Sequence, residues 1–307
     1  MVSIFDDTKL LSYTDSDLLK QITFHPRLPR YPNISLLSEK YLAKGCMKYE
    51  LDDGVTAMQV ASQLDIRLPH VHRIVQQDNA FYCIMDRIPG IALDEAWPNL
   101  GWISSLRLAF QLRRVIHRMR SVTSVTAGSL PTGKCTSYFL DDSFRLPFRA
   151  TIHHVNAFLN FWANFTSFTL EVKKTPAEHA ICPKSVFSYS RPFVFTHHDL
   201  APRNIILDPE GQLWIIDWDC AGFYPDFFEY AGMFNFIPSA SWTKSALLRW
   251  KLFAWIAAGF YNKERRLLER IRYRFTRFGA FRRFNMKAGG YAAMSEIPDK
   301  YAESDTD

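Results

Sequence analysis

Two carboxylates and one amide stand around a short predicted hairpin. Asp199 precedes the hairpin, Asn204 lies at its start, and Asp217 follows its last strand. Two short apolar runs joined by the Asp-Pro-Glu-Gly turn at 208–211 predict this hairpin. Because a hairpin brings its two ends together, Asn204 and Asp217 are expected side by side.

These residue types in this order favour phosphoryl transfer. The oxygen atoms of Asn204 and Asp217 suit Mg²⁺, which takes few protein ligands and adds phosphate oxygens and water. Asp199 would then accept the proton of an attacking hydroxyl group. Positioning, charge neutralisation by a metal ion and a modest base are the parts that phosphoryl transfer needs.

Two simpler interpretations compete with this one. Asp and Asn favour turns for purely local reasons, although three such residues in this order favour the chemical interpretation. His197 and His198 could form a transition-metal site, but adjacent residues of a strand point to opposite faces and seldom share one ion. Asp219 is either a second acidic group near the metal or, as we favour, a structural hydrogen-bond acceptor.

The composition bounds the class of protein. The chain has 307 residues, of which 48% are hydrophobic, so one two-lobed enzyme or two modest domains can form a core. The first residues show no signal peptide, and the longest apolar stretch, 247–261, is interrupted by two basic residues and too short to span a bilayer. Five dispersed cysteines without a CxxC pair are typical of reduced thiols and predict a cytoplasmic protein.

The positive charge is concentrated near the C-terminus. Residues 262–287 contain ten Lys or Arg and two Glu, whereas the whole chain has a net charge of +6. The rest is nearly neutral, so no nucleic-acid partner is expected from overall charge. The basic segment also contains aromatic residues, which leaves nucleic acid or an anionic membrane surface as an alternative. We favour an amphipathic closing helix with a solvated basic face.

The N-terminal third is predicted to be mainly β-sheet. Alternation and β-branched residues predict strands at 34–37, 41–44, 71–75 and 81–85. A further strand is expected at 46–51, between the second and third of these. Residues 55–64 have helical spacing, with Asp52 and Asp53 as possible N-terminal caps. The Ile88-Pro89-Gly90 cluster is a breaker at which we place the lobe boundary.

The remainder is predicted to be mainly helical. Helices are expected at 104–121, 153–169, 245–260 and 264–275, and strands at 192–196, 205–207 and 213–216. Aromatic residues recur at helical spacing in the second helix and indicate core packing, with an aromatic substrate pocket as the alternative; they are Phe158, Phe161, Trp162, Phe165 and Phe168.

The segment 193–232 resembles the aminoglycoside phosphotransferase-like (choline kinase-like) family, and in particular its fungal branch. The resemblance is carried by His-His-Asp-Leu-Ala-Pro-Arg-Asn at 197–204, by Ile-Asp-Trp-Asp at 216–219, and by Ala-Gly-Phe-Tyr-Pro-Asp-Phe-Phe-Glu-Tyr at 221–230. It implies a protein-kinase-like fold, ATP and Mg²⁺ as cofactors, and a hydroxyl group of a small molecule as acceptor.

The resemblance also implies roles for single residues. Asp199 would be the catalytic base, Asn204 and Asp217 would hold the metal ion, and His197 would brace the loop. Many protein kinases carry a phosphate-contacting lysine where this chain has Ala201, and Arg203 could supply that charge instead.

The upstream part resembles the nucleotide-binding lobe. Residues 82–90 look like the last strand and the hinge that holds adenine, so Asp86, Arg87 and Ile88 are candidate nucleotide contacts. Lys44 is the candidate for the phosphate-binding lysine, with Lys48 as the alternative. The family usually places a glutamate about ten residues later, where this chain has Gly54, and no glycine-rich loop precedes residue 44.

The sequence therefore predicts an α+β, two-lobed protein-kinase-like fold. Residues 1–87 would form a β-rich nucleotide-binding lobe with one helix, and residues 88–307 a helical lobe with the catalytic hairpin and the acceptor site. The predicted function is a small-molecule kinase. The alternative is a degraded kinase that binds nucleotide or a partner without transferring phosphate, which the residue at position 54 supports.

Overall fold

A computed structural model describes residues 5–78, 80–181 and 184–288. The chain forms two compact units, each built from three segments. Unit 1 contains residues 1–112, 200–219 and 236–250, and unit 2 contains residues 113–199, 220–235 and 251–307. In the part of the chain that the structure describes, no helix is both long and apolar enough to cross a membrane.

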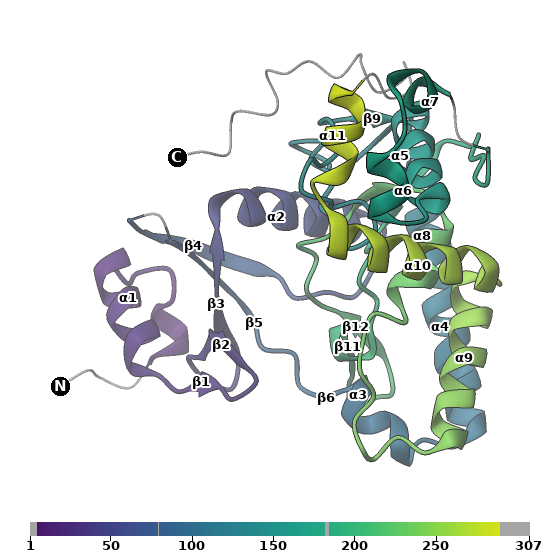
Figure 1. Cartoon of the computed structure of the whole chain (residues 1–307). Coiled ribbons are helices and arrows are strands. Elements are labelled where there is room, and N and C mark those ends of the chain that lie inside the picture. Colours follow the sequence, from purple (N-terminus) through teal and green to yellow (C-terminus); the bar gives the residue numbers. More distant parts are fainter. Residues whose placement is uncertain (1–4, 79, 182–183, 289–307) are drawn as a thin grey trace. The chain divides into compact units, whose positions relative to one another are not determined.

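Unit 1 is built on a five-stranded antiparallel sheet in the order β1-β2-β3-β5-β4 (Figure 1). The strands are β1 (Arg27–Leu28), β2 (Tyr31–Leu36), β3 (Tyr41–Met47), β4 (Val71–Gln77) and β5 (Ala80–Asp86). Two helices accompany the sheet, α1 (Asp15–Phe24), after the 3₁₀ turn Asp7–Lys9, and α2 (Lys48–Gln63). The four longer strands agree with the predicted ones.

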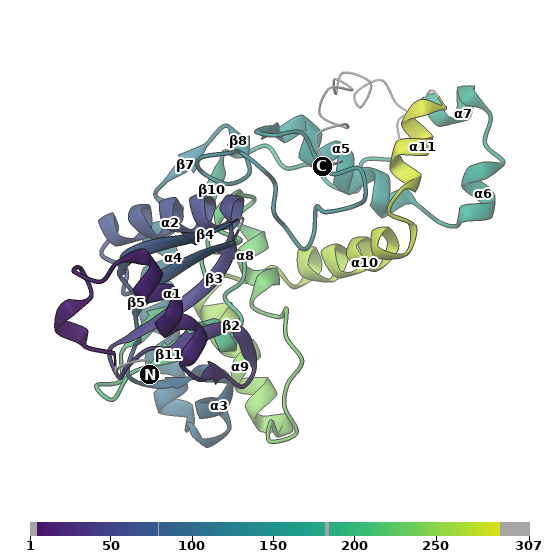
Figure 2. The same cartoon turned by 90° about the vertical axis from the view of Figure 1, so that its left-hand side faces the viewer.

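Alternation along the strands gives the sheet two different faces. Ala43 on β3 and its cross-strand neighbour Ile84 on β5 are buried against α1, together with Leu18 and Ile22 of that helix. Figure 2 shows α1 in front of the strands. The next residue of β3, Lys44, points to the opposite face, because successive side chains of a strand alternate. The charged side chain therefore leaves the core on the face that α2 borders.

The expected strand at 46–51 is wrong, because helix α2 begins at Lys48. The side chain of Glu50 accepts the Met47 N–H at 3.0 Å, which satisfies a free donor at the helix N-terminus. Asp52 and Asp53 are therefore interior residues of α2 and not its caps. The helix starts seven residues before the predicted one and includes Gly54, which the pattern had placed outside it.

The predicted hairpin forms in unit 1. Strands β11 (Ile205–Leu207) and β12 (Leu213–Ile215) pair antiparallel, and β6 (Ile91–Ala92) adds a third strand beside β11. The hinge chain passes close to β11, because a Cβ atom at Gly90 would lie 2.5 Å from the Leu207 carbonyl oxygen. Gly90 also has a φ of +152°, which side chains disfavour.

The other helices of unit 1 follow the hinge. They are α3 (Leu93–Ala96), the 3₁₀ turns Trp97–Asn99 and Pro202–Asn204, and parts of α4 (Trp102–Arg120) and α9 (Lys244–Ala258), which run through the unit boundaries. The indole of Trp97 donates to the Ala246 carbonyl at 2.9 Å, and Arg249 donates to the Trp97 carbonyl at 3.1 Å. Both helices agree with the predicted ones within two residues.

Unit 2 is mainly helical and carries two small sheets. The sheets contain β7 (Thr123–Ser124), β10 (Phe193–Thr196) and β13 (Gly222–Tyr224) in the order β13-β10-β7, and the pair β8 (Thr126–Ala127) and β9 (Ala150–Thr151). The helices are α5 (Ile152–Asn164), α6 (Phe168–Val172), α7 (Pro176–Ala180), α8 (Phe227–Gly232), α10 (Asn262–Phe278) and α11 (Phe281–Lys287). The expected helix at 153–169 is divided into α5 and α6.

Most of the aromatic residues of that segment belong to the core of unit 2. Phe158, Phe161, Trp162 and Phe165 are buried and pack with residues of α10, which confirms core packing for them. Phe168 is 51% exposed and begins α6, so it does not belong to this core. The helical period breaks at residue 165, where the backbone becomes extended.

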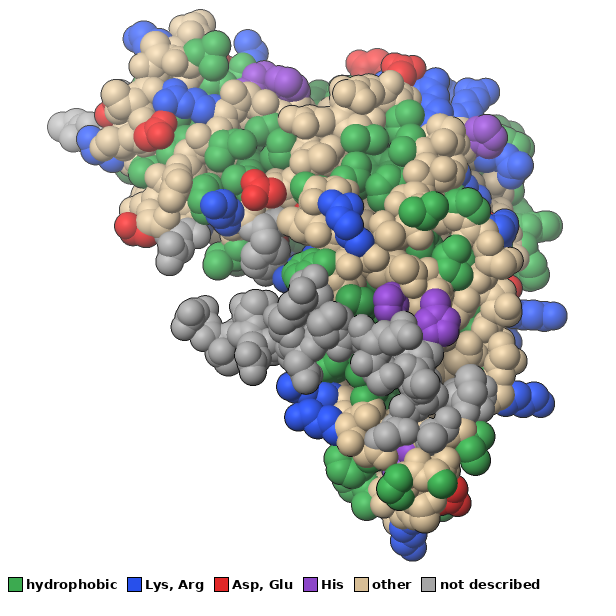
Figure 3. Space-filling view, turned by 90° about the horizontal axis from the view of Figure 1, so that it is seen from above, with side chains coloured by type: hydrophobic (Ala, Val, Ile, Leu, Met, Phe, Trp, Pro, Cys, Tyr) green, Lys and Arg blue, Asp and Glu red, His purple; other side chains and the backbone are tan. Residues whose placement is uncertain are grey.

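The basic segment is amphipathic, but several of its arginines point inward. Arg282 has no exposed surface and forms two hydrogen bonds with the Asp142 carboxylate, at 2.6 and 2.8 Å. Arg274 donates to the Trp162 and Ala163 carbonyls at the end of α5. The face in Figure 3 carries Lys and Arg side chains, some single and some in small groups, among apolar and acidic ones. The prediction of a solvated basic face is therefore only partly right.

Candidate active site

A cavity of about 650 Å³ lies within unit 1. Its walls come from β2, β3 and β5, from α2, from the hinge and from the hairpin. Seven of the eight predicted site residues line it: Lys44, Asp86, Arg87, Ile88, Arg203, Asn204 and Asp217. The volume is in the range of small-molecule sites.

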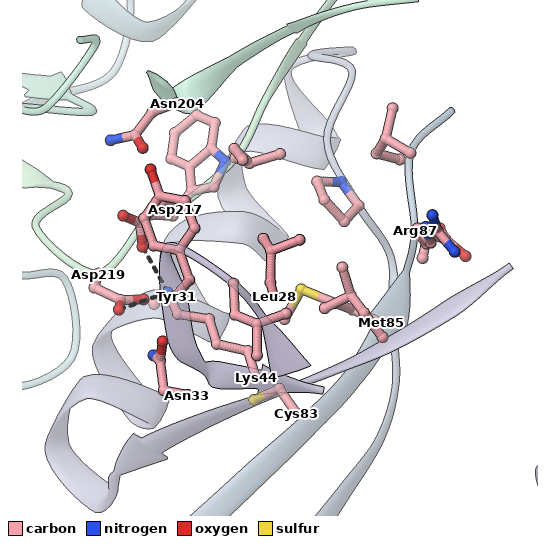
Figure 4. A pocket seen from close by; sticks show the side chains of 18 of the residues that line it. Leu28, Tyr31, Asn33, Lys44, Cys83, Met85, Arg87, Asn204, Asp217 and Asp219 are labelled. Atoms are coloured by element: carbon pink, nitrogen blue, oxygen red, sulfur yellow. Dashed lines mark hydrogen bonds and ion pairs between the residues drawn. The ribbon is translucent and has the colours of Figure 1, made fainter. Parts of the chain in front are cut away.

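Lys44 forms ion pairs with two carboxylates in this cavity (Figure 4). Its Nζ lies 2.5 Å from an Asp217 oxygen and 2.7 Å from an Asp219 oxygen. Burial by itself lowers the pKa of Lys44, but the charges of Asp217 and then Asp219 more than offset this, so the pKa is raised and the ammonium stays charged. Lys48, the alternative lysine, is the exposed first residue of α2 and does not line the cavity.

The hairpin places Asn204 beside Asp217, as predicted. The Ile216 N–H donates to the Asn204 carbonyl at 3.0 Å, and Ile205 pairs with Ile215 in the ladder. Asp217 has a φ of +67°, an unfavourable conformation for a residue other than glycine. Such outliers concentrate at functional sites, which supports a chemical role for this carboxylate.

Two of the three candidate nucleotide contacts at the hinge already use their backbone N–H groups. The N–H groups of Asp86 and Arg87 already donate to the carbonyls of His70 and Lys40, at 3.1 and 2.7 Å. Within the residues that the structure describes, the backbone of Ile88 makes no such bond. Of the three predicted nucleotide contacts, Ile88 is therefore best suited to meet adenine with its backbone.

Asp199 belongs to unit 2, where the surrounding loop is tied down by one buried acid. Glu229 of α8 accepts the N–H groups of His197 and His198, at 2.8 and 3.1 Å. The Asp199 N–H in turn donates to His197 Nδ1 at 3.3 Å. His197 thus has the bracing position that the resemblance implied, and Glu229 anchors the loop.

His198 is a packed core residue. Its ring stacks on Tyr224 at 4.6 Å between ring centres and shares a 2.8 Å hydrogen bond with Ser137. In the described part of the chain, no three His, Cys, Asp or Glu side chains are grouped as metal ligands. Its φ of +69° and the close approach of Gly232 to its carbonyl oxygen shape the turn before Asp199.

Two side chains of unit 2, Asn235 and Arg272, form a chain of hydrogen bonds that ends at the Asp199 carboxylate. The amide nitrogen of Asn235 donates to an Asp199 oxygen at 3.3 Å, and Arg272 of α10 donates to the Asn235 amide oxygen at 2.8 Å. The Arg272 guanidinium also lies over the Tyr138 ring, 5.4 Å from its centre. The Asn235 amide is thereby oriented with its nitrogen toward the candidate base.

Glu229 and His198 make opposite contributions to stability. Burial raises the pKa of Glu229 to about 7, above its ordinary value of 4.5. The raised pKa of Glu229 contributes stability to the folded state at low pH, and this contribution is lost as the pH rises through 7. Burial lowers the pKa of His198 to about 3 from 6.5, which favours the folded state above pH 6.5 and is lost as the pH falls.

Between about pH 4.5 and 6.5 the pH dependences of the two contributions cancel. The pair binds one proton in either state, on Glu229 in the folded protein and on His198 in the unfolded chain. The substitution Glu229→Gln removes the contribution of Glu229 and leaves that of His198. Relative to wild type, the free energy of unfolding of the variant is expected to decrease by up to about 1.4 kcal/mol per pH unit as the pH falls through this window. Urea unfolding at several pH values measures this, and equal pH slopes for both proteins would contradict it.

The fold resembles that of solved aminoglycoside kinases. The structure of a thermostable aminoglycoside phosphotransferase APH(4)-Ia with ADP and hygromycin B is 15% identical and covers 90% of this chain and 94% of its own, with a TM-score of 0.52. The gentamicin complex of APH(2'')-IIa is 15% identical, with 92% and 95% coverage and a TM-score of 0.47. APH(3'')-Id from Streptomyces rimosus is 17% identical, with 79% and 88% coverage and a TM-score of 0.48.

These observations define the class of protein, an α+β protein with the two-lobed kinase-like fold of small-molecule phosphotransferases. The profile of the phosphotransferase enzyme family matches residues 50–261, more than half of the chain. The chain belongs to this family. Among proteins with curated descriptions, none is similar enough in sequence to count as a relative.

Sequence reasoning missed several residues that the structure brings to these sites. Asn235 and Arg272 lie 36 and 73 positions after Asp199, and neither has a pattern that marks it. For Asp219 the sequence favoured a structural acceptor role but did not indicate its partner, which is Lys44. A signal for that contact existed, because Gly54 in an otherwise regular helix indicates a close approach by another group.

Proposed function

We propose that this protein is an ATP- and Mg²⁺-dependent kinase that transfers the γ-phosphate to a hydroxyl group of a small molecule. One observation carries the proposal. The largely buried lysine of β3 meets a strained aspartate at the end of the hairpin, beside an asparagine, within a cavity large enough for a nucleotide.

The donor atoms at this place fit the proposed cofactors. The side chains of Asn204 and Asp217 both line the cavity and offer oxygen atoms, and Figure 4 shows them pointing toward one another. Hard cations such as Mg²⁺ prefer oxygen ligands. A bound Mg²⁺ ion and ATP would supply charge neutralisation and the phosphoryl group to be transferred.

The residues of the chain would divide the remaining work. The Lys44 ammonium would bind phosphate oxygens, and Arg203 on the cavity wall would add positive charge to the same groups. The backbone of Ile88 would orient adenine. Asp199, held by Asn235, would accept the proton of the acceptor hydroxyl as that oxygen attacks.

Nucleotide binding is the first test of this proposal. ATP is expected to raise the melting temperature of the protein in the presence of Mg²⁺, and clearly less in the presence of EDTA, because binding to the folded state stabilises it. An equal shift in both conditions would contradict the metal site. No shift at millimolar ATP would contradict the nucleotide site.

The acceptor is proposed to be neutral or anionic rather than polycationic. Arg272 lies one side chain away from Asp199, and its partners are the Asn235 amide and the Tyr138 ring. In the described part of the chain it forms no ion pair, so its charge is not neutralised. Aminoglycosides are polycations, and a guanidinium group beside the base would repel them. The segment 135–191, with both acidic and basic residues, is not acidic overall either.

Arg272→Ala tests this assignment. It is expected to raise the KM for an anionic acceptor about 10- to 100-fold, the range of a charged hydrogen bond, and to leave Mg²⁺-ATP binding unchanged. Arg270→Ala removes the same charge from an exposed position of α10 and serves as the control. A screen of hydroxy acids, neutral polyols and amino sugars measures the preference. Amino sugars as the best acceptors would contradict the assignment.

The degraded kinase is the second candidate function. It is favoured by Gly54, which leaves helix α2 without a carboxylate at the place where the family usually carries a glutamate. Magnesium-dependent ATP binding without any phosphorylated product would favour it. We further propose that the chain belongs to the fungal branch of the family, supported by residues 221–230. We also propose that it is cytoplasmic, supported by its five dispersed cysteines without a CxxC pair.

A further inference from the structure

Two of the carboxylates that line the cavity are paired with one lysine, Lys44. Lys44 is 16% exposed, and Asp217 and Asp219 are 41% and 33% exposed. Within the described residues, Lys44 makes ion pairs with these two carboxylates and with no other. Two acidic groups thus share one ammonium group.

The two carboxylates cannot both keep this partner if the proposed cofactors bind. Asp217 lies at the hairpin end beside Asn204, where oxygen atoms would be committed to a divalent cation. A largely buried ammonium that loses its counter-ion is destabilised, because the charge is no longer compensated in a poorly solvated place. Asp219 is the other carboxylate with which Lys44 forms an ion pair.

Helix α2 is shaped to admit the Asp219 side chain. A Cβ atom at Gly54 would lie 3.1 Å from an Asp219 carboxylate oxygen and 3.8 Å from its Cα atom. Glycine inside a helix costs about 1 kcal/mol relative to alanine, so its presence needs a reason, and this contact supplies one. The nearby acid of the helix, Glu50, already accepts the Met47 N–H.

We infer that Asp219 is the residue that positions Lys44 when nucleotide and metal are bound, and that Gly54 makes room for it. The carboxylate that holds the lysine comes from the chain after the hairpin and not from helix α2. The inference rests on the proposed function. It also removes the main argument for a degraded kinase, because the missing helical carboxylate has a replacement on the other side of the same lysine.

Transferring the negative charge from position 219 to position 54 of helix α2 tests the inference. Asp219→Asn is expected to raise the KM for ATP and lower kcat, together about 10- to 100-fold in kcat/KM, with little change in the Mg²⁺ concentration required. Gly54→Glu alone is expected to be impaired by contact and repulsion with Asp219. The double variant Gly54→Glu/Asp219→Ala is expected to recover at least tenfold over Asp219→Ala alone.

The matched control is Gly54→Gln/Asp219→Ala, which has the same shape without the charge and should recover nothing. Equal recovery in the Glu and Gln versions would overturn the inference. So would an Asp219→Asn variant whose main defect is a higher Mg²⁺ requirement, because that result would make Asp219 a metal ligand.

If the variants at position 54 fold poorly, a double-mutant cycle between Lys44 and Asp219 tests the inference without them. In a Lys44→Met background, Asp219→Asn is expected to have no further effect on ATP binding, since Asp219 acts through the lysine. A full additional loss in that background would also overturn the inference. If wild type binds no Mg²⁺-ATP, the proposed function itself fails; if wild type is active and the transplanted charge does not rescue, only the role of Asp219 fails.

Discussion

Replacing Asp199 with asparagine is expected to lower kcat roughly 10²- to 10⁴-fold, the usual contribution of a general base, while Mg²⁺-ATP binding stays unchanged. The substitution keeps the size and polarity of the side chain but removes its ability to take a proton. The loop should keep its conformation, because Glu229 holds it through the N–H groups of His197 and His198.

Nucleotide binding should survive this change, because the lysine, the hinge and the proposed metal ligands all belong to unit 1, whereas Asp199 belongs to unit 2. Steady-state turnover with any accepted substrate, together with ATP titration by calorimetry, separates the two effects. Glu210→Gln, at the exposed turn of the hairpin, is the control and should behave as wild type. Undiminished turnover of the Asp199→Asn variant would exclude the base.

Asp217→Asn is expected to have the second largest effect. It removes the negative charge of the proposed metal ligand, so the Mg²⁺ concentration for half-maximal ATP binding should rise at least roughly tenfold. The kcat value at saturating Mg²⁺ should fall by roughly 10²-fold or more, since a bound cation stabilises transition-state charge by several kcal/mol. Lys44 retains Asp219 as its counter-ion, so the protein should still fold.

Titration of Mg²⁺ at fixed ATP, followed by turnover, measures this effect. Asp52→Asn removes an exposed carboxylate of α2 in the same unit and is the control. An unchanged Mg²⁺ requirement in Asp217→Asn would place the metal elsewhere.

The parts of the site that lie close together in the sequence could be predicted. Asn204 and Asp217 are separated by one hairpin, whose turn residues and apolar strands determine its register. Lys44 could be chosen over Lys48 only as a preference, because a pattern of alternation does not say which face a cavity borders. The predicted division at residue 87 stays a prediction.

Other parts depend on contacts between distant residues. The start of α2 was misplaced, because its N-terminal bond is made by Glu50 to Met47 and the apolar period becomes regular only after Asp53. The inward arginines of α10 and α11 resemble any basic helical face in the sequence. What turns Arg282 into the core is the buried carboxylate of Asp142, 140 positions away.

The most direct test of phosphoryl transfer follows the γ-phosphate itself. The protein is incubated with a cell metabolite extract, Mg²⁺ and ATP that is isotopically labelled in its γ-phosphate, and organic products are examined by mass spectrometry. The account predicts that the label appears in a phosphomonoester of a small molecule, only with Mg²⁺, and not with the Asp199→Asn variant. Mg²⁺-dependent binding of ATP without label in any organic product would contradict it.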